Sequence, residues 1–215
     1  VIPNFKQLTI LTEDELIHQK KVPYKLCTFS RVMKEKGIET AINAVNQVNE
    51  KLGYKAYSLD IYGQVDPEQV LWFDSLMADA GDNIKYCGCV AANMSVEVLK
   101  DYFALLFPTH YFTEGIPGTI IDAYAAGVPV ISAKWESFAD VIDDGKNGFF
   151  FKNEDELPKL ILDAMEMDLD VLKEKNVKAI FFVTSHYITY SPDTVKRMVD
   201  EKIDGVDFIG VNTDK

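Results

Sequence analysis

The sequence predicts an α/β fold in which helices flank a parallel β-sheet. From about residue 24 onward, apolar runs of strand length alternate with segments whose apolar residues recur at helical spacing. The chain has 215 residues, 47% of them hydrophobic and 26% charged. That length and composition are typical of a soluble protein with a sizeable core.

The first strand and helix are predicted from Tyr24 to Gly53. Residues 24–30 form a short apolar run. The apolar residues that follow return at helical spacing, and Gly53 is a plausible helix stop. They are Ile38, Ile42, Val45, Val48 and Leu52.

Similar units continue toward the C-terminus, and together they predict a domain over residues 24–167. The predicted strands are 56–62, 84–87, 104–107, 128–132 and 148–151, and the predicted helices are 67–80, 95–102, 118–126 and 155–165. Residues 1–23 are interpreted as a linker and interdomain segment. Near Asp168 the pattern changes, which predicts an appended βαβ segment over residues 168–215, with strands 177–184 and 206–211 around a helix 192–202.

Charge and cysteine content exclude several function classes. The 22 basic and 34 acidic residues give a net charge of −12, which disfavours a nucleic-acid partner. The three cysteines cannot all pair and lack zinc-type spacing, so we expect a reduced, cytoplasmic compartment and no metal site. No run approaches the ~20 apolar residues of a spanning helix, and no secretory signal is evident, so we expect a soluble chain without a transmembrane segment.

Two loops can carry chemistry, because ligands of parallel α/β sheets bind beyond the carboxyl ends of the strands. The first, residues 30–37, contains Arg31 and Lys36, which can converge on a phosphate. Arginine occurs elsewhere only at position 197. The alternative interpretation is that both basic residues are simply solvated.

The second loop, residues 113–122, places Glu114 before a turn rich in glycine and proline and a helix start. Small residues let the backbone approach a diphosphate, the helix start supplies N–H donors, and a carboxylate can accept bonds from sugar hydroxyls. The alternative is an acidic helix start that favours the helix dipole.

Together these features resemble the donor-binding half of retaining glycosyltransferases with two Rossmann-like domains (GT-B), the family of sucrose synthases and many bacterial mannosyl- and glucosyltransferases. The resemblance covers about residues 1–165. It is carried by Ile2-Pro3-Asn4, Arg31 with Lys36-Gly37, Ile61-Tyr62-Gly63, Tyr86-Cys87-Gly88, Glu114-Gly115 and Ala125-Ala126-Gly127-Val128-Pro129-Val130.

The resemblance implies a role for each matching residue. Arg31 and Lys36 would neutralise the diphosphate, and Glu114 would orient the donor sugar. Asp122, which is one methylene shorter than the family's glutamate, would face the ribose. The remaining donor-binding positions would be Gly63, Cys89, Val90, Gly118 and Thr119.

The implied reaction transfers a sugar from a UDP- or GDP-linked donor to an acceptor hydroxyl with retention, without a cofactor or metal. The acceptor, a saccharide or lipid-linked saccharide, would bind an N-terminal domain that this chain lacks, so the chain alone would bind donor but turn over poorly. The expected setting is bacterial cell-surface polysaccharide or glycolipid synthesis, in the cytoplasm, with the full-length protein peripheral at the inner membrane face.

Other interpretations stay open at this point. His110 can touch phosphate or sugar, although a lone histidine at a strand end is more often structural. Residues 169–201 resemble a piece of polysaccharide deacetylases, but the aspartate and histidine pairs of that family's metal site are missing, so no deacetylase activity is expected. A further alternative is a non-catalytic α/β module whose acidic surface contacts other proteins.

Overall fold

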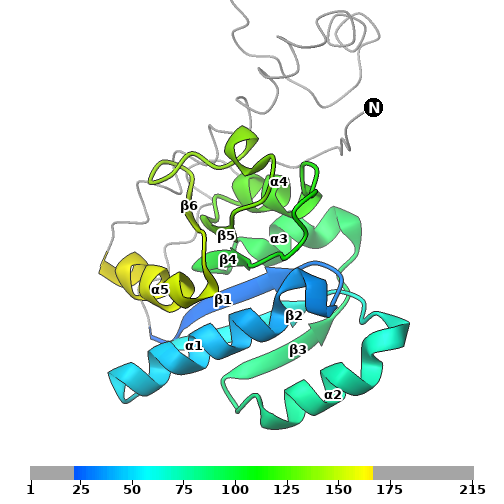
Figure 1. Ribbon diagram of the computed structural model, residues 1–215, viewed down its shortest axis with the longest axis vertical. Helices are drawn as coiled ribbons and strands as arrows, with labels where there is room; N and C mark the ends of the chain where they lie inside the picture. Colours follow the sequence, from blue (N-terminus) through cyan, green and yellow to red (C-terminus); the bar gives the residue numbers. More distant parts are fainter. Residues whose placement is uncertain (1–21, 167–215) are drawn as a thin grey trace, which may run out of the picture.

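The computed structural model describes residues 22–166, which form a six-stranded, wholly parallel sheet in the order β3-β2-β1-β4-β5-β6 (Figure 1). The strands are β1 (Tyr24–Phe29), β2 (Tyr57–Tyr62), β3 (Ile84–Gly88), β4 (Ala104–Phe107), β5 (Val130–Ala133) and β6 (Gly148–Phe151). The helices are α1 (Ile38–Leu52), α2 (Val70–Asp79), α3 (Ser95–Leu99), α4 (Gly118–Ala125) and α5 (Leu157–Glu166). The predicted α/β architecture with a Rossmann-like sheet is therefore confirmed.

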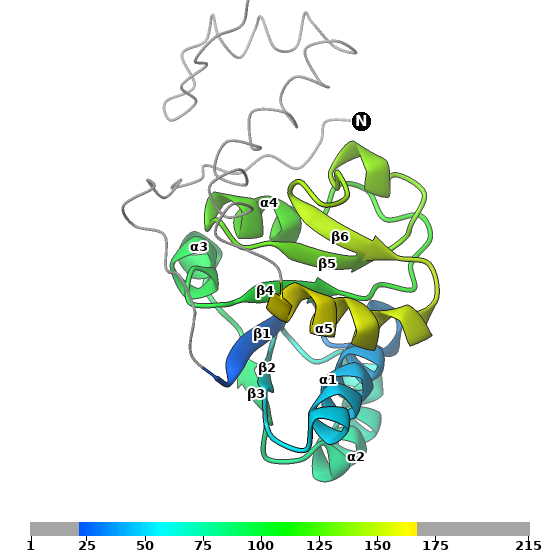
Figure 2. The ribbon, with the colours of Figure 1, turned by 90° about the vertical axis from the view of Figure 1, so that its left-hand side faces the viewer.

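Helices cover both faces of the sheet, as Figure 2 shows. One core lies between the sheet and the helices α1, α2 and α5, and the other lies between the sheet and α3 and α4. Successive residues of a strand alternate between the two cores: Leu106 packs with the first and Leu105 with the second. Every residue of β4 and β5 is buried, which is why these central strands are continuous apolar runs.

The predicted elements agree with the observed ones most closely where local signals are strong. Helix 38–52 and strands 104–107 and 148–151 have the expected bounds. The predicted helix 67–80 instead begins with a 3₁₀ turn, Pro67–Gln69, before α2. The strand expected from residue 128 begins at Val130, because the Val128 amide still donates to the Ala123 carbonyl and closes the end of α4. Most of the predicted linker and the whole appended segment lie outside the described residues.

The sheet changes direction of winding between β1 and β4. From β1 the chain proceeds to β2 and β3 on one side, whereas β4, β5 and β6 lie on the other. At such a switch point the connections leave the neighbouring strand ends in opposite directions and open a crevice. The loops singled out in the sequence follow β1 and β4, so both lie at this crevice. Within residues 22–166, no helix is long and apolar enough to cross a membrane.

Candidate functional site

The backbone around Arg31 is fixed by the end of β2. The Ser30 amide donates to the Tyr62 carbonyl at 3.2 Å, and the Val32 amide donates to the Gln64 carbonyl at 2.8 Å. The Arg31 side chain is exposed and makes no hydrogen bond or ion pair within the described residues. It therefore remains available to a ligand at the crevice.

Next to Arg31 lies Glu35, which belongs to the 3₁₀ turn Lys34–Lys36. The hydrogen bond from Gln69 lowers the pKa of the Glu35 carboxyl, and the charges of Lys34 and Arg31 lower it further. The Glu35 backbone carbonyl accepts a 2.8 Å bond from the His110 amide, so this turn also touches the loop that follows β4.

Gly37 allows the two loops to meet. Its φ is +67°, and a Cβ atom built on it would lie 1.8 Å from the carbonyl oxygen of Pro108. Only glycine tolerates both that backbone conformation and that approach. The residue before it, Lys36, is consequently held against the loop after β4.

Lys36 and Glu114 form an ion pair across this contact, although 78 positions separate them in the sequence. The side chains are only 15% and 14% exposed. The Lys36 ammonium also lies 4.9 Å from the ring centre of Tyr111 and 5.9 Å from that of Phe107. The pair is thus largely withdrawn from water. Away from water, the attraction between the ammonium and the carboxylate is less screened.

The Glu114 carboxylate uses only one of its two oxygens in these contacts. Lys36 Nζ and Thr109 Oγ1 both donate to Oε1, Thr109 at 3.0 Å. Oε2 has no hydrogen-bond partner among residues 22–166. A carboxylate oxygen can accept hydrogen bonds from hydroxyl groups, so Oε2 is an open acceptor site.

Helix α4 begins four residues after Glu114, and within residues 22–166 no capping side-chain hydrogen bond is present at its N-terminus. The N-cap residue, Pro117, supplies no side-chain hydrogen bond, and a Cβ at Gly118 would meet nothing within 4 Å. Thr119 Oγ1 is buried without a hydrogen-bond partner among the described residues. Free backbone N–H groups, an unpaired hydroxyl and the positive end of the helix dipole together favour an anion.

The other predicted binding residues are more dispersed. Asp122, one turn into α4, is 5% exposed and interacts within the protein, so its ribose contact stays a prediction. Gly63 has a backbone reason to be glycine, because a Cβ there would lie 1.7 Å from the Ser30 carbonyl oxygen. Cys89 is exposed and Val90 half-buried just beyond β3. No contact of these four residues with Lys36 or Glu114 is observed.

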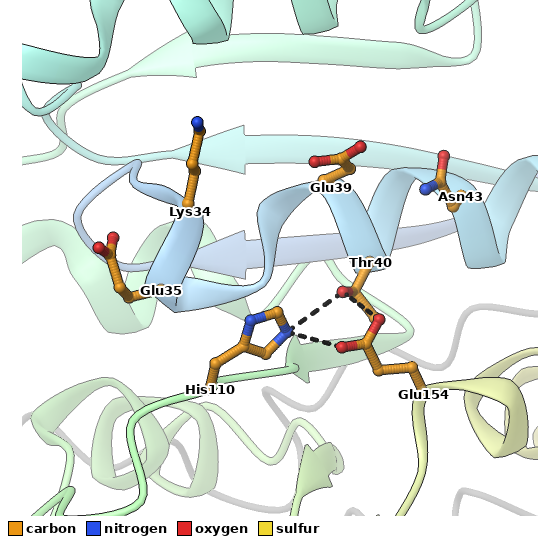
Figure 3. A pocket seen from close by; sticks show the side chains of 7 residues that line it. All are labelled: Lys34, Glu35, Glu39, Thr40, Asn43, His110 and Glu154. Carbon is orange, nitrogen blue, oxygen red and sulfur yellow. Dashed lines mark hydrogen bonds and ion pairs between the residues drawn. The ribbon is translucent and has the colours of Figure 1, made fainter.

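Sequence reasoning missed a polar cluster beside this site, formed by Thr40, His110 and Glu154. It lines a cleft of about 350 Å³ together with Lys34, Glu35, Glu39 and Asn43 (Figure 3). His110 Nε2 lies 3.3 Å from Thr40 Oγ1 and 3.1 Å from Glu154 Oε1. The sequence singles out His110 by itself, and a threonine on the otherwise apolar buried face of α1 is a second local signal, but neither reveals the cluster. Across residues 22–166 there is no cluster of histidine, cysteine and carboxylate side chains that could hold a metal ion.

Comparisons with known proteins identify the family. The family model described as "Glycosyl transferases group 1" matches residues 12–180, which extends into the segment predicted to be appended. The GtfA subunit of the UDP-N-acetylglucosamine–peptide N-acetylglucosaminyltransferase from Streptococcus gordonii is 31% identical over 150 residues, covering 68% of this chain and 28% of that protein. The amylovoran biosynthesis glycosyltransferase AmsK from Erwinia amylovora is 24% identical over 164 residues, covering 74% of this chain and 39% of AmsK.

A solved structure of this family shares the fold. The C-terminal domain of the group 1 glycosyltransferase LpcC from Francisella tularensis matches with a TM-score of 0.63 at 17% identity, over 82% of this chain and 98% of that domain. The chain spans well under half the length of the two curated relatives. With a family match over residues 12–180, the chain belongs to the group 1 glycosyltransferases, and it shares the fold of the LpcC C-terminal domain.

Proposed function

We propose that the chain is the donor-binding domain of a retaining glycosyltransferase and that it binds a nucleoside-diphosphate sugar at the crevice between β1 and β4. The observation that carries the proposal is the Lys36–Glu114 ion pair beside the uncapped start of α4. It joins a cation, an open carboxylate oxygen and free amide donors at one switch point. These are the groups that a diphosphate linked to a sugar requires.

Charge supports a phosphate ligand at this place. The whole chain carries a net charge of −12, so an anion needs local positive groups to approach. An ammonium group has three N–H donors, and Lys36 uses one on Glu114, which leaves donors for a phosphate oxygen. Arg31, five residues earlier with a free guanidinium, would supply the second cation. The α4 amides at Gly118 and Thr119 would complete the diphosphate site.

The sugar would lie against Glu114. Because Lys36 and Thr109 both occupy Oε1, the free Oε2 is the atom that would accept a sugar hydroxyl. The same Lys36 that holds Glu114 would thereby connect the diphosphate to the sugar contact. During transfer, the cations and helix amides would stabilise the negative charge that develops on the departing diphosphate.

The name of the S. gordonii relative favours a UDP-linked donor over a GDP-linked one, and AmsK suggests polysaccharide synthesis as the setting. The acceptor would be a saccharide or lipid-linked saccharide bound by a separate N-terminal domain. The chain by itself would therefore bind donor without efficient transfer.

Calorimetric titration with UDP, GDP and the corresponding sugar nucleotides tests the proposal. We expect saturable binding of UDP, weakened about ten- to a hundredfold by Arg31→Ala or Lys36→Met, because each removes a charge-assisted hydrogen bond. Lys55→Ala is the matched control, since it also removes one positive charge. Lys55 pairs with Asp82 at the amino ends of the strands, opposite to the carboxyl ends where the donor would bind. Lys55→Ala should leave UDP affinity nearly unchanged.

Two outcomes would refute the proposal. One is the absence of nucleotide binding at millimolar concentration. The other is UDP binding that Arg31→Ala and Lys55→Ala affect equally, which would indicate only a general charge effect.

Because side-chain cations and helix amides would neutralise the diphosphate, we further expect UDP affinity to be the same with a chelator as with added Mg²⁺. A requirement for Mg²⁺ would show that the site uses a metal.

A further inference from the structure

The loop that carries Glu114 also contains His110. Together with Thr40 and Glu154, His110 forms a polar cluster that we call the clasp. Thr40 belongs to α1, His110 follows β4, and Glu154 lies in the 3₁₀ turn after β6. The clasp therefore joins three segments that are far apart in the sequence. In Figure 3 one nitrogen of the histidine ring faces both the threonine and the glutamate side chain, whereas Lys34 and Glu39 point away from the ring.

The hydrogen-bond donors and acceptors of the clasp determine which ring nitrogen of His110 carries a hydrogen. Thr40 Oγ1 donates its single hydrogen to Glu154 Oε2 at 2.9 Å. The hydroxyl and the carboxylate can then only accept from the ring nitrogen. Nε2 must consequently carry a hydrogen, shared between Thr40 Oγ1 at 3.3 Å and Glu154 Oε1 at 3.1 Å. All three side chains constrain one another, so the ring has one favoured orientation.

This orientation bears on Glu114 through the neighbouring residue. Thr109 Oγ1 accepts a hydrogen bond from the Tyr111 amide at 3.2 Å and donates to Glu114 Oε1 at 3.0 Å. The His110 amide is bonded to the Glu35 carbonyl. Thr109, which binds Glu114, thus directly precedes the residue whose side chain is fixed by the clasp. A rotation of the backbone at His110 would move Thr109 and Tyr111 together and misplace the carboxylate.

We propose that Thr40, His110 and Glu154 are positioning residues that set the orientation of the Glu114 carboxylate, and thereby the affinity for the sugar part of the donor. The inference rests on the proposed donor-binding function. Glu154, although remote from the diphosphate loops in the sequence, then tunes how the domain distinguishes a sugar nucleotide from the free nucleotide. In this proposal the clasp acts on the donor through Glu114 and not by direct contact.

The test compares UDP with UDP-N-acetylglucosamine by calorimetry in the full 215-residue chain. His110→Phe keeps an aromatic ring but removes the Nε2 donor, and Glu154→Ala removes both acceptors. We expect each to weaken binding of the sugar nucleotide about three- to tenfold, with UDP affinity changed by less than about twofold. Asp155→Ala is the control, since Asp155 is an exposed carboxylate in the same turn without a partner among the described residues.

In the double variant, the losses of sugar-nucleotide affinity caused by His110→Phe and Glu154→Ala should not add, because both substitutions disrupt the same cluster. Equal weakening of UDP and of the sugar nucleotide, or no change in either, would overturn the proposal. Should His110→Phe fail to fold, Glu154→Ala still decides, since the Glu154 side chain is 59% exposed.

Hydrogen exchange of the free protein separates this inference from the proposed function. We expect Glu154→Ala to speed amide exchange in residues 109–114 several-fold relative to Asp155→Ala, whether or not nucleotide binds. If the wild-type protein binds no nucleotide, the proposed donor-binding function is refuted, whatever the exchange rates show. If exchange in this loop is the same in both variants, the positioning role is refuted even when UDP binds.

Discussion

At the scale of single residues, Gly37 decides whether the two binding loops can meet. Its backbone lies in the left-handed region and its missing side chain lets the Pro108 carbonyl approach. Lys36, the preceding residue, forms its ion pair with Glu114 beside that approach. Gly37, which also precedes the first residue of α1, is therefore part of the site.

Gly37→Ala should lower the free energy of unfolding by about 2–5 kcal/mol, through a strained φ and overlap with the Pro108 carbonyl. Gly53→Ala is a matched control, because Gly53 caps the other end of α1 at φ +75° with nothing within 4 Å of a built Cβ. There only the backbone strain applies, about 1 kcal/mol. Urea denaturation of both variants measures the difference, and equal losses would contradict the steric argument.

At the scale of elements, β2 and α5 are joined by a buried hydrogen bond. The Tyr57 hydroxyl donates to the Ile161 carbonyl at 2.6 Å, across 104 positions of sequence. Burial raises the pKa of the Tyr57 phenol well above its ordinary value, consistent with a hydroxyl that stays protonated as a donor. α5 also packs Leu157, Ile161 and Ala164 into the core that contains α1.

Tyr57→Phe should lower the free energy of unfolding by about 1 kcal/mol, because it deletes this hydrogen bond and keeps the packed ring. Tyr54→Phe serves as the control, since the Tyr54 side chain is half exposed and no bond of its hydroxyl is observed in residues 22–166. Thermal denaturation monitored by circular dichroism compares the two. A Tyr57→Phe protein as stable as Tyr54→Phe would show that the bond contributes nothing.

At the scale of the whole molecule, three tyrosines link stability to alkaline pH. Burial is the main cause that raises the pKa of Tyr57, Tyr102 and Tyr124. Hydrogen bonds with Tyr62 and Asp60 raise that of Tyr102 further. Unfolding would release all three phenols to their ordinary pKa of 10.0.

The sign of the pH effect follows from that difference. Above pH 10 the unfolded chain loses phenolic protons that the folded protein retains, so the unfolded state becomes favoured. The contribution of these tyrosines to stability should be complete below pH 10 and decline as the pH rises beyond it. Urea midpoints measured against pH, together with tyrosinate absorbance, test this. Full ionisation of every tyrosine while the circular dichroism remains native would contradict it.

The sequence by itself determined the elements and the edge of the sheet at which the site lies. Helical spacing from Ile38 to Leu52 and the apolar run Ala104–Phe107 are local patterns, so they specified α1 and β4 with the observed bounds. Residues that follow strands must lie at the carboxyl edge of a parallel sheet. The sequence alone therefore predicts that Arg31, Lys36 and Glu114 lie at one edge.

Only the tertiary structure decided which of these residues touch. The partnership of Lys36 with Glu114, the free Glu114 Oε2 and the clasp between Thr40 and Glu154 depend on segments 78 and 114 positions apart. They also depend on the strand order that sets β1 beside β4. A local pattern reports how a short segment folds, whereas contacts of this kind arise from the packing of the whole sheet and its helices, in which backbone approaches such as that of Gly37 to Pro108 fix the distances.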